Sequence, residues 1–380
     1  MDISQRLLGE ALMAGLGAFV RSLFSAGDAG ISVPAMDGVF KPDNRLEEAA
    51  RLMSLTGIDN VAASPAGLLC SAGGKLFRID LDGANATSVE IADFSAPVTF
   101  VASAPDGRLA VGVEDNGLHV GQPGNWKRID LPRDIVSCLT AGVFAADGTL
   151  LLCVGSRKHP ARDWKRDLME RGASGGVFAV DPTDGSYRAL AGDLAFPNGA
   201  AFLGDGRLAI SESWRHRMIA VDPKSAMRPK AILEDLPAYP CRLSSASGGG
   251  LWMALFAPRR QLFELVLRED DYRHEMMATI DPGEWIGPEL AGSVRPDQPL
   301  SQGSVRQMGV LKPWAPSRSY GLVARCDNSG ATKESWHSRA DGSMHGITSV
   351  CEQDDSIYAT SRGSGTLLRL PINAGGAAHG

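Results

Sequence analysis

One short pattern recurs six times along this chain of 380 residues. In each copy an apolar run leads into a tight turn of polar residues and glycine, and a second apolar run follows the turn. Asp-Gly and Gly-Gly pairs between strand-like runs are typical of hairpins, because these residues tolerate the backbone conformations of a tight turn. The copies are SPAGLLCSA (64–72), APDGRLAVG (104–112), AADGTLLLC (145–153), LGDGRLAIS (203–211), SGGGLWMAL (247–255) and QDDSIYATS (353–361).

The spacing of these turns predicts the architecture. The first three copies are about 40 residues apart, which is the period of one four-stranded sheet in a β-propeller. Six copies therefore predict an all-β chain folded as a six-bladed β-propeller. An α/β barrel is the alternative, but it requires a helical pattern of about 10–15 residues after every strand, and the sequence contains none.

The ends of the repeat region predict how the ring closes. The sixth unit ends near Ile372 and lacks an outer strand, so we expect residues 45–57 to supply it. The propeller then spans residues 31–372. An insertion at 257–319, between blades 5 and 6, is expected to form a lid over the channel entrance. Residues 373–380 are expected to be a flexible tail.

Residues 1–30 are expected to form an amphipathic helix, because apolar residues recur there at steps of three and four. We expect this helix to dock on the protein's own body or on a second subunit, which would give a homodimer. Contact with a membrane surface is the alternative. Asp2 and Glu10 make the stretch a poor secretory signal. This favours a cytoplasmic protein, with a periplasmic or membrane-associated one as the alternative.

The charge of the chain indicates the kind of partner it binds, and its cysteines indicate the redox compartment. The chain has 38 Lys and Arg against 44 Asp and Glu, a formal charge of −6, and no basic run. Nucleic acid is therefore excluded as the main partner, and a small-molecule substrate is expected. The six cysteines form no CxxC pair and lie mostly in apolar runs, which favours a reducing compartment over a disulfide framework.

The innermost strand of each propeller blade lines the axial channel, and its residues can be located by counting. Equivalent positions lie eight residues before the turn glycine on five strands, with the nearest match taken in the sixth unit. These positions hold Asp59, Thr99, Thr140, Asn198, Cys241 and His345. Apolar side chains would fill a structural axis at lower cost, because a polar group without a hydrogen-bond partner is destabilising there. The sequence therefore predicts a functional site on the axis.

Several stretches of the chain resemble the strictosidine-synthase-like proteins. They are VPAMDGVFKPDNRLEEA (33–49), DLMERGASGGVFAVDP (167–182), FPNGAAFLGDGRLAISESWRHRMIAVDP (196–223), YPCRLSSASGGGLWMALFAPRRQ (239–261) and HGITSVCEQDDSIYATSRGSG (345–365). That family is part of a broader six-bladed group with the gluconolactonase/senescence-marker proteins and the paraoxonase-type arylesterases. The resemblance covers about residues 33–372, and it is more specific for the fold than for the reaction.

In the lactonase branch, the resemblance implies a divalent ion, usually calcium, held on the axis by Glu, Asn, Asn and Asp from four blades. The matching residues in this chain are Asp59, Thr140, Asn198 and Cys241, of which Asn198 alone is kept. Calcium prefers about six to eight oxygen ligands with several carboxylates. Asp59, Asn198 and Cys241 are the candidate ligands, either for calcium or for a softer ion such as Zn²⁺ together with His345. An axis without metal is the alternative.

The synthase branch uses a glutamate on the last inner strand to condense an amine with an aldehyde. Thr348 matches that position and cannot act as the acid or base, so strictosidine-type condensation is not expected. Thr348 is instead expected to contact the substrate, as are Thr99, Thr140, Arg242 and the insertion's Trp285. Because side chains alternate along a strand, we expect only one of Cys241 and Arg242 to line the pocket.

The resemblance implies a hydrolase that acts on an ester or lactone of a small organic molecule in the axial pocket. Asn198 and Asp59 would polarise the carbonyl, directly or through a metal. His345 would be the general base, since the ordinary pKa of histidine lies near neutrality. A Cys241 thiolate beside His345 is an alternative catalytic nucleophile. The other classes left open are a lyase, isomerase or cyclase of a specialised pathway, and a non-enzymatic binding propeller.

Overall fold

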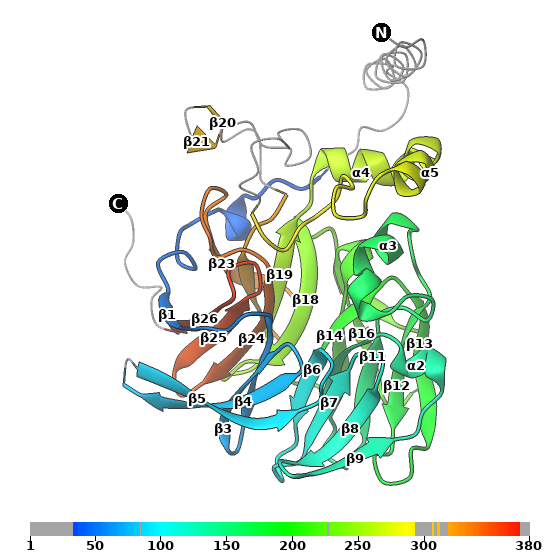
Figure 1. The fold of residues 1–380 in the computed structure, drawn as a ribbon, viewed down its shortest axis with the longest axis vertical. Helices are drawn as coiled ribbons and strands as arrows, with labels where there is room; N and C mark the ends of the chain where they lie inside the picture. Colours follow the sequence, from blue (N-terminus) through cyan, green and yellow to red (C-terminus); the bar gives the residue numbers. More distant parts are fainter. Residues whose placement is uncertain are drawn as a thin grey trace. The chain divides into compact units, whose positions relative to one another are not determined.

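The computed structural model describes residues 33–83, 85–225, 228–292, 306–307, 310–311 and 318–372. The helix expected at 1–30 and the tail expected at 373–380 lie outside these ranges. Within them, six four-stranded antiparallel sheets follow one another along the chain (Figure 1). The predicted six-bladed, all-β propeller is therefore confirmed.

Each sheet is one blade, in which the first strand named below lies at the axis and the last lies at the outside. Blade 1 consists of β2 (Ile58–Ser64), β3 (Gly67–Ala72), β4 (Lys75–Asp82) and β5 (Asn85–Asp93). Blade 2 consists of β6 (Val98–Ser103), β7 (Leu109–Val113), β8 (Gly117–Gln122) and β9 (Asn125–Ile129). Blade 3 consists of β10 (Leu139–Phe144), β11 (Leu150–Val154), β12 (Gly175–Val180) and β13 (Tyr187–Leu194). Blade 4 consists of β14 (Pro197–Phe202), β15 (Leu208–Glu212), β16 (Arg217–Val221) and β17 (Lys230–Leu233). Blade 5 consists of β18 (Ala238–Ser245), β19 (Leu251–Pro258), β22 (Leu322–Cys326) and β23 (Thr332–His337). Blade 6 consists of β24 (Ile347–Gln353), β25 (Ser356–Ser361), β26 (Thr366–Pro371) and β1 (Ala50–Ser54).

The repeated turns join the first and second strands of the blades. Gly107, Gly148 and Gly206 have φ angles of 83°, 86° and 84°, in the left-handed region that favours glycine. The aspartate before each glycine accepts a hydrogen bond from the amide two residues further on, at 3.0 Å in all three turns. These local bonds fix the turn before the blade packs on its neighbours.

The first strands of the blades contact one another in a closed cycle, in the order β2, β6, β10, β14, β18 and β24 and back to β2. The cycle is completed at the outside of blade 6, where β1 pairs antiparallel with β26, with Ala50 opposite Arg369 and Ser54 opposite Thr366. The expected closure by residues 45–57 is therefore confirmed.

The inner strands of blades 4 and 5 approach so closely that a side chain cannot fit between them. A Cβ atom on Gly199 would lie 2.4 Å from the backbone oxygen of Cys241 and 2.7 Å from the backbone nitrogen of Leu243. We expect Gly199→Ala to lower the free energy of unfolding by about 2 kcal/mol, as overpacking against rigid backbone does. Urea unfolding measures this. Gly192→Ala is the matched control, because a Cβ there meets nothing within 4 Å.

The insertion interrupts blade 5 itself. It lies between the second strand β19 and the third strand β22, so its expected position between blades 5 and 6 is wrong. Turn spacing located the extra length but could not show which strand followed it. The described part includes α4 (Gln261–Arg268), α5 (Asp270–Thr279) and a short hairpin of β20 (Arg306–Gln307) and β21 (Val310–Leu311).

All six cysteines are buried, and none forms a disulfide. Across the residues described, no helix combines the length and apolar character needed to span a membrane.

Candidate functional site

The register of the innermost strand shifts in every blade, close to the start of that strand. Among the residues left out of the pairing are Asp59 on β2, Thr99 on β6, Thr140 on β10, Asn198 on β14, Cys241 with Arg242 on β18, and Thr348 on β24. A bulge bends the strand and redirects a side chain. All seven residues line one axial cavity of about 310 Å³.

The bulge on β18 differs from the others because it holds two residues. Register is lost between Pro240 and Leu243, so the usual alternation of side chains does not apply to Cys241 and Arg242. Both therefore line the cavity, and the expectation that only one of them would do so is wrong.

Asp59 and Arg242 form a two-pronged ion pair on the floor of the cavity. Nη1 of Arg242 lies 3.1 Å from Oδ1 of Asp59, and Nη2 lies 3.0 Å from Oδ2. The exposed guanidinium of Arg362 adds a longer contact of 3.5 Å to Oδ1. Burial alone would raise the pKa of the Asp59 carboxyl. The charges of Arg242 and Arg362 outweigh burial and hold that pKa below its usual value.

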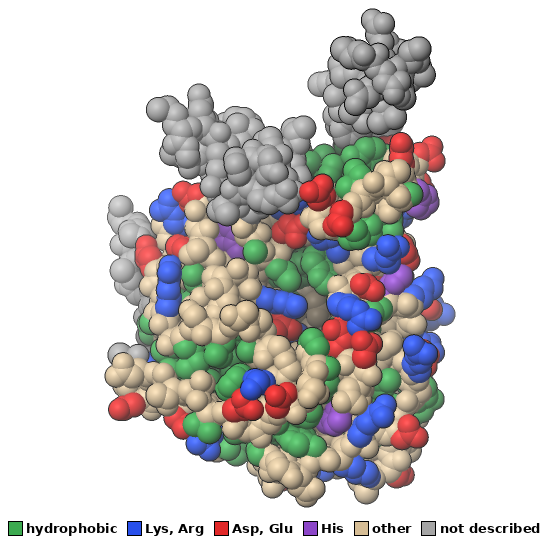
Figure 2. Space-filling model, viewed as in Figure 1, with side chains coloured by type: hydrophobic (Ala, Val, Ile, Leu, Met, Phe, Trp, Pro, Cys, Tyr) green, Lys and Arg blue, Asp and Glu red, His purple; other side chains and the backbone are tan. Residues whose placement is uncertain are grey.

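Arg242 also separates the cavity from a second hollow further along the axis. That hollow has a volume of about 270 Å³ and is lined mostly by small and apolar residues of the inner strands. Arg242 lines both spaces, so its side chain divides the channel. In Figure 2 the molecule is hollowed near the centre of one face, between basic and acidic side chains.

Aromatic side chains form part of the cavity wall. Phe196 stacks on Trp214 with ring centres 4.4 Å apart, and Trp164 meets Phe256 edge to face at 5.6 Å. Trp164 begins α3 (Trp164–Met169), in the loop between β11 and β12. The insertion contributes Leu290. The cavity therefore has a charged floor and an aromatic wall, which suits a small organic ligand with both polar and apolar parts.

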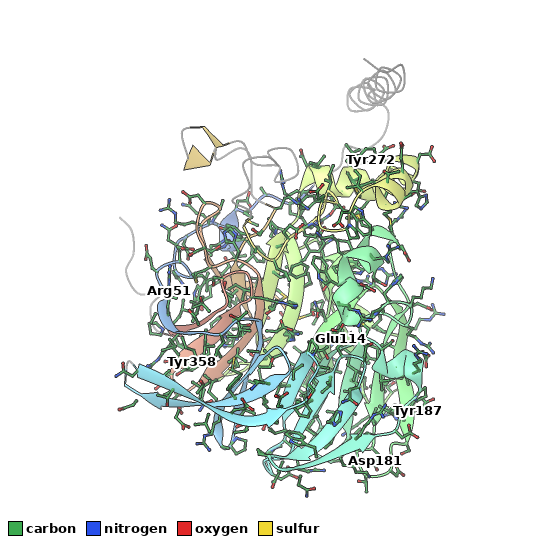
Figure 3. The ribbon with its side chains drawn as sticks, in the orientation of Figure 1. Arg51, Glu114, Asp181, Tyr187, Tyr272 and Tyr358 are labelled. Carbon is green, nitrogen blue, oxygen red and sulfur yellow. The ribbon has the colours of Figure 1, made fainter. Side chains whose placement is uncertain are left out.

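Sequence reasoning missed three charged residues that line this cavity, Glu114, Arg162 and Arg362. Nη1 of Arg162 lies 3.5 Å from Oε1 of Glu114. Glu114, labelled in Figure 3, follows β7, and Arg362 follows β25, so each comes directly after the second strand of its blade. The second strand runs antiparallel to the first, so it ends at the level where the first begins. The position directly after each second strand was thus a usable signal. The Glu114 side chain is about one-tenth exposed, and its Oε1 accepts the backbone amide of Arg162 at 2.9 Å.

Cys241 lies beside Asn198, whose amide nitrogen donates to Sγ of Cys241 at 3.4 Å and to Oγ of Ser213 at 3.1 Å. Burial raises the pKa of the Cys241 thiol to about 11, although Arg242 acts in the opposite direction. The group is therefore a thiol at neutral pH, whereas a cysteine nucleophile reacts as the thiolate.

We therefore expect Cys241→Ser to change kcat by less than about threefold, as for a residue that only lines the cavity. Alkylation of Cys241 by iodoacetamide, followed by peptide mass analysis, should be slow at pH 7.5 and should accelerate as the pH rises toward about 11. Rapid alkylation at neutral pH, with loss of activity, would restore Cys241 as a nucleophile.

His345 is not among the residues that line the axial cavity. It lies before β24, and its side chain is fully buried. Its Nδ1 lies 2.7 Å from Oγ of Ser319, and its Nε2 lies 2.8 Å from the backbone oxygen of Arg339. Thr348 occupies the sixth axial position in its place. The sixth turn contains Asp-Asp rather than a glycine, so counting from the turn was imprecise there.

Trp285 is likewise outside the cavity lining. It is buried within the insertion in a cluster with Met169, Val266 and Met276, and its Nε1 donates to the backbone oxygen of Ile280 at 2.9 Å. The other expected contacts, Thr99, Thr140, Arg242 and Thr348, do line the cavity.

The residues on the axis do not fit a calcium or zinc ion. Both carboxylate oxygens of Asp59 accept hydrogen bonds from Arg242, and the hydroxyl of Thr140 donates to the backbone oxygen of Pro197 at 2.6 Å. Cys241 is a protonated thiol. Across the described residues, no three His, Cys, Asp or Glu side chains come together in a way that could hold a metal.

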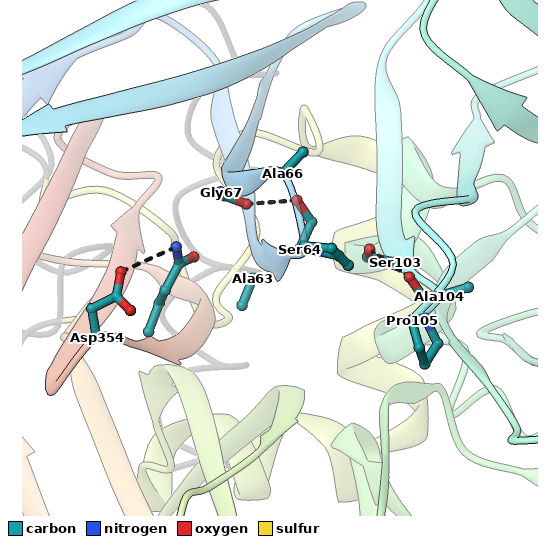
Figure 4. Close-up of a pocket in the computed structure, with 10 residues that line it drawn as sticks. Ala63, Ser64, Ala66, Gly67, Ser103, Ala104, Pro105 and Asp354 are labelled. Carbon is teal, nitrogen blue, oxygen red and sulfur yellow. Dashed lines mark hydrogen bonds between the residues drawn. The ribbon is translucent and has the colours of Figure 1, made fainter.

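A further hollow lies at the ends of inner strands, where the turn after β2, the end of β6 and the turn between β24 and β25 meet (Figure 4). Small residues such as Ala63, Ser64 and Ser103 line it, and Asp354 is its charged member. Oδ2 of Asp354 accepts a hydrogen bond from Gln353 at 3.4 Å. This surface presents no set of groups with catalytic chemistry.

The fold and the axial cavity define the class of protein as a six-bladed β-propeller with a ligand-sized pocket at the inner strands. A scan against protein-family models finds no match, and a search of curated proteins finds none either. Solved structures do match. A gluconolactonase from Xanthomonas campestris aligns with a TM-score of 0.54 and 16% identity, over 91% of this chain and 99% of its own.

Two further structures show the same likeness. Regucalcin from Agrobacterium tumefaciens, described as a calcium-binding protein, aligns with a TM-score of 0.53 and 14% identity, over 85% of this chain and 93% of its own. A putative gluconolactonase aligns with a TM-score of 0.53 and 14% identity, over 85% and 91%. The expected likeness to gluconolactonase-type propellers is confirmed for the fold. The strictosidine-synthase-like assignment stays a prediction.

Proposed function

We propose that this protein is a hydrolase that cleaves an ester or lactone of a small organic molecule in the axial cavity. The observation that carries the proposal is that a carboxylate, Glu114, and an exposed guanidinium, Arg362, both line one cavity of about 310 Å³. Such a volume suits a small ligand. The fold shared with the gluconolactonases supports the same reaction class.

In this mechanism Glu114 is the general base in place of His345. The bond from the Arg162 amide to Oε1 fixes the Glu114 carboxylate. That carboxylate accepts a proton from water while the water oxygen attacks the substrate carbonyl. Arg362 donates hydrogen bonds to the oxyanion that forms, since a charged donor stabilises such an oxygen strongly. The C–O bond then breaks, and Glu114 returns the proton to the departing alkoxide.

Asp59, Asn198 and Thr99 do not act as the base in this proposal, but they position other groups. The Asp59 carboxylate is held ionised with a lowered pKa, which makes it a poor base. It orients Arg362 through the 3.5 Å contact. Asn198 and Thr99 border the same cavity and would contact the polar groups of the substrate.

The test is incubation with a panel of five- and six-membered lactones and aryl esters in ¹⁸O-labelled water, followed by mass analysis. Hydrolysis adds the elements of one labelled water to the product. A product of the same mass as the substrate would indicate an isomerase or cyclase and contradict the hydrolase proposal. Elimination into two fragments without label would indicate a lyase. Ligand binding without turnover across the panel would favour a binding propeller.

A further inference from the structure

Arg242 reaches the axis from blade 5, and its guanidinium contacts backbone or side-chain oxygens of three other blades. Besides the two carboxylate oxygens of Asp59 on β2, Nη1 lies 3.4 Å from the backbone oxygen of Asp59 and 3.1 Å from that of Thr348 on β24. Nη2 lies 2.6 Å from the backbone oxygen of Thr99 on β6. Five oxygens from blades 1, 2 and 6 thus surround one cation.

This environment has the chemistry of a site for a hard cation. Carboxylate and backbone carbonyl oxygens, drawn from several elements, are the ligands that calcium takes in proteins. In this protein the positive charge is supplied by the chain itself, and the side chain of Arg242 is largely buried at 14% exposure. A guanidinium suits the position better than an ammonium, because its planar fork matches a carboxylate with two parallel hydrogen bonds.

We propose that the Arg242 guanidinium is the structural cation of the propeller axis and occupies the place that a divalent metal ion would take. It joins the inner strand of blade 5 to those of blades 1, 2 and 6, and it neutralises Asp59. The axis of the native protein therefore takes up no divalent ion. This inference holds whichever reaction the pocket performs.

The first test is made on the native protein and does not depend on a substrate. Isothermal titration with calcium, magnesium or zinc should show no saturable binding at millimolar concentration, and the melting temperature should be the same with metal and with chelator. Stoichiometric binding of a divalent ion, abolished in Asp59→Asn, would overturn the proposal.

The second test removes the guanidinium. Arg242→Ala leaves Asp59 and the carbonyl oxygens without their main cation, so the melting temperature should fall by about 5 °C or more. Calcium or methylguanidinium should then restore part of the loss. Arg259→Ala is the matched control, because Arg259 is also largely buried and pairs with Asp235 and Glu264 away from the axis. Its melting temperature should fall without rescue by either cation.

Two outcomes of the second test would contradict the proposal. One is that Arg242→Ala melts at the temperature of the native protein, and the other is that neither cation restores any of its loss. If Arg242→Ala fails to fold, the double variant Asp59→Asn/Arg242→Gln replaces it. That pair is neutral and of similar size, so it should melt above either of its single variants and show no response to calcium. A calcium-stabilised double variant would equally count against the proposal.

Discussion

Replacing Glu114 with glutamine is expected to lower kcat at least about 100-fold on any substrate that the hydrolysis screen identifies, as loss of a general base does. Glutamine keeps the size of the side chain and can still accept the Arg162 amide that fixes Glu114. It cannot accept the proton of the attacking water. The measurement is kcat and KM of the variant and of the native protein on that substrate.

Asp115→Asn is the control for this variant. Asp115 is the next residue, and it pairs with Nη1 of Arg162 at 2.6 Å, but it is not part of the cavity lining. Its φ of 56° is one that asparagine adopts readily, so the loop should be unchanged. Its kcat should remain within about twofold of the native value. If Glu114→Gln raised KM and left kcat intact, Glu114 would be a substrate-binding residue and another base would be needed.

Replacing Asp59 with alanine is expected to cost about 3–5 kcal/mol of unfolding free energy, the usual result of breaking a buried ion pair on one side. Arg242 would keep its charge at the centre of the ring and lose the carboxylate that both of its terminal nitrogens contact. Urea unfolding measures the loss. Small carboxylates such as acetate should raise the melting temperature of the variant and leave that of the native protein unchanged.

The pH dependence gives an independent check on the same ion pair. Because the folded protein holds the pKa of Asp59 below its usual value, the stability that the pair contributes is fully present above that usual value. It is lost as the pH falls through the lowered pKa of the folded state. The Asp59→Ala variant should lack this acid-sensitive step. Asp80→Ala is the control, since Asp80 forms an exposed pair with Arg78 and its loss should leave the melting temperature unchanged.

The fold could be predicted from the sequence because its determinants are local. Each blade carries its own turn, whose glycine and aspartate need only neighbouring residues to form the bend. The same periodicity located five of the six axial positions, from Asp59 to Cys241. It failed at His345, where the turn has no glycine to count from.

The chemistry of the site depended on residues that counting back from the turns did not reach. The bulge on β18 turned Arg242 into the cavity beside Cys241, against the alternation of a regular strand. Glu114 and Arg362 enter the same cavity from loops more than two hundred residues apart in the chain. Trp285 resembled a lid residue in composition, but its ring packs inside the insertion, in a cluster with Met169, Val266 and Met276. These polar groups come together only when the six blades assemble into the closed propeller, so short stretches of sequence do not show which of them meet.

The seam between β1 and β26 has a consequence for how the protein is made. Blades 1 to 5 are each built from strands that follow one another along the chain, so they can form as the chain leaves the ribosome. β1 is synthesised before any of them and has no partner until β26 emerges. A nascent chain that stops short of β26 is an open arc with unpaired strand edges, and such edges invite pairing with other chains. Completion of the last blade is therefore the step that removes these unpaired edges.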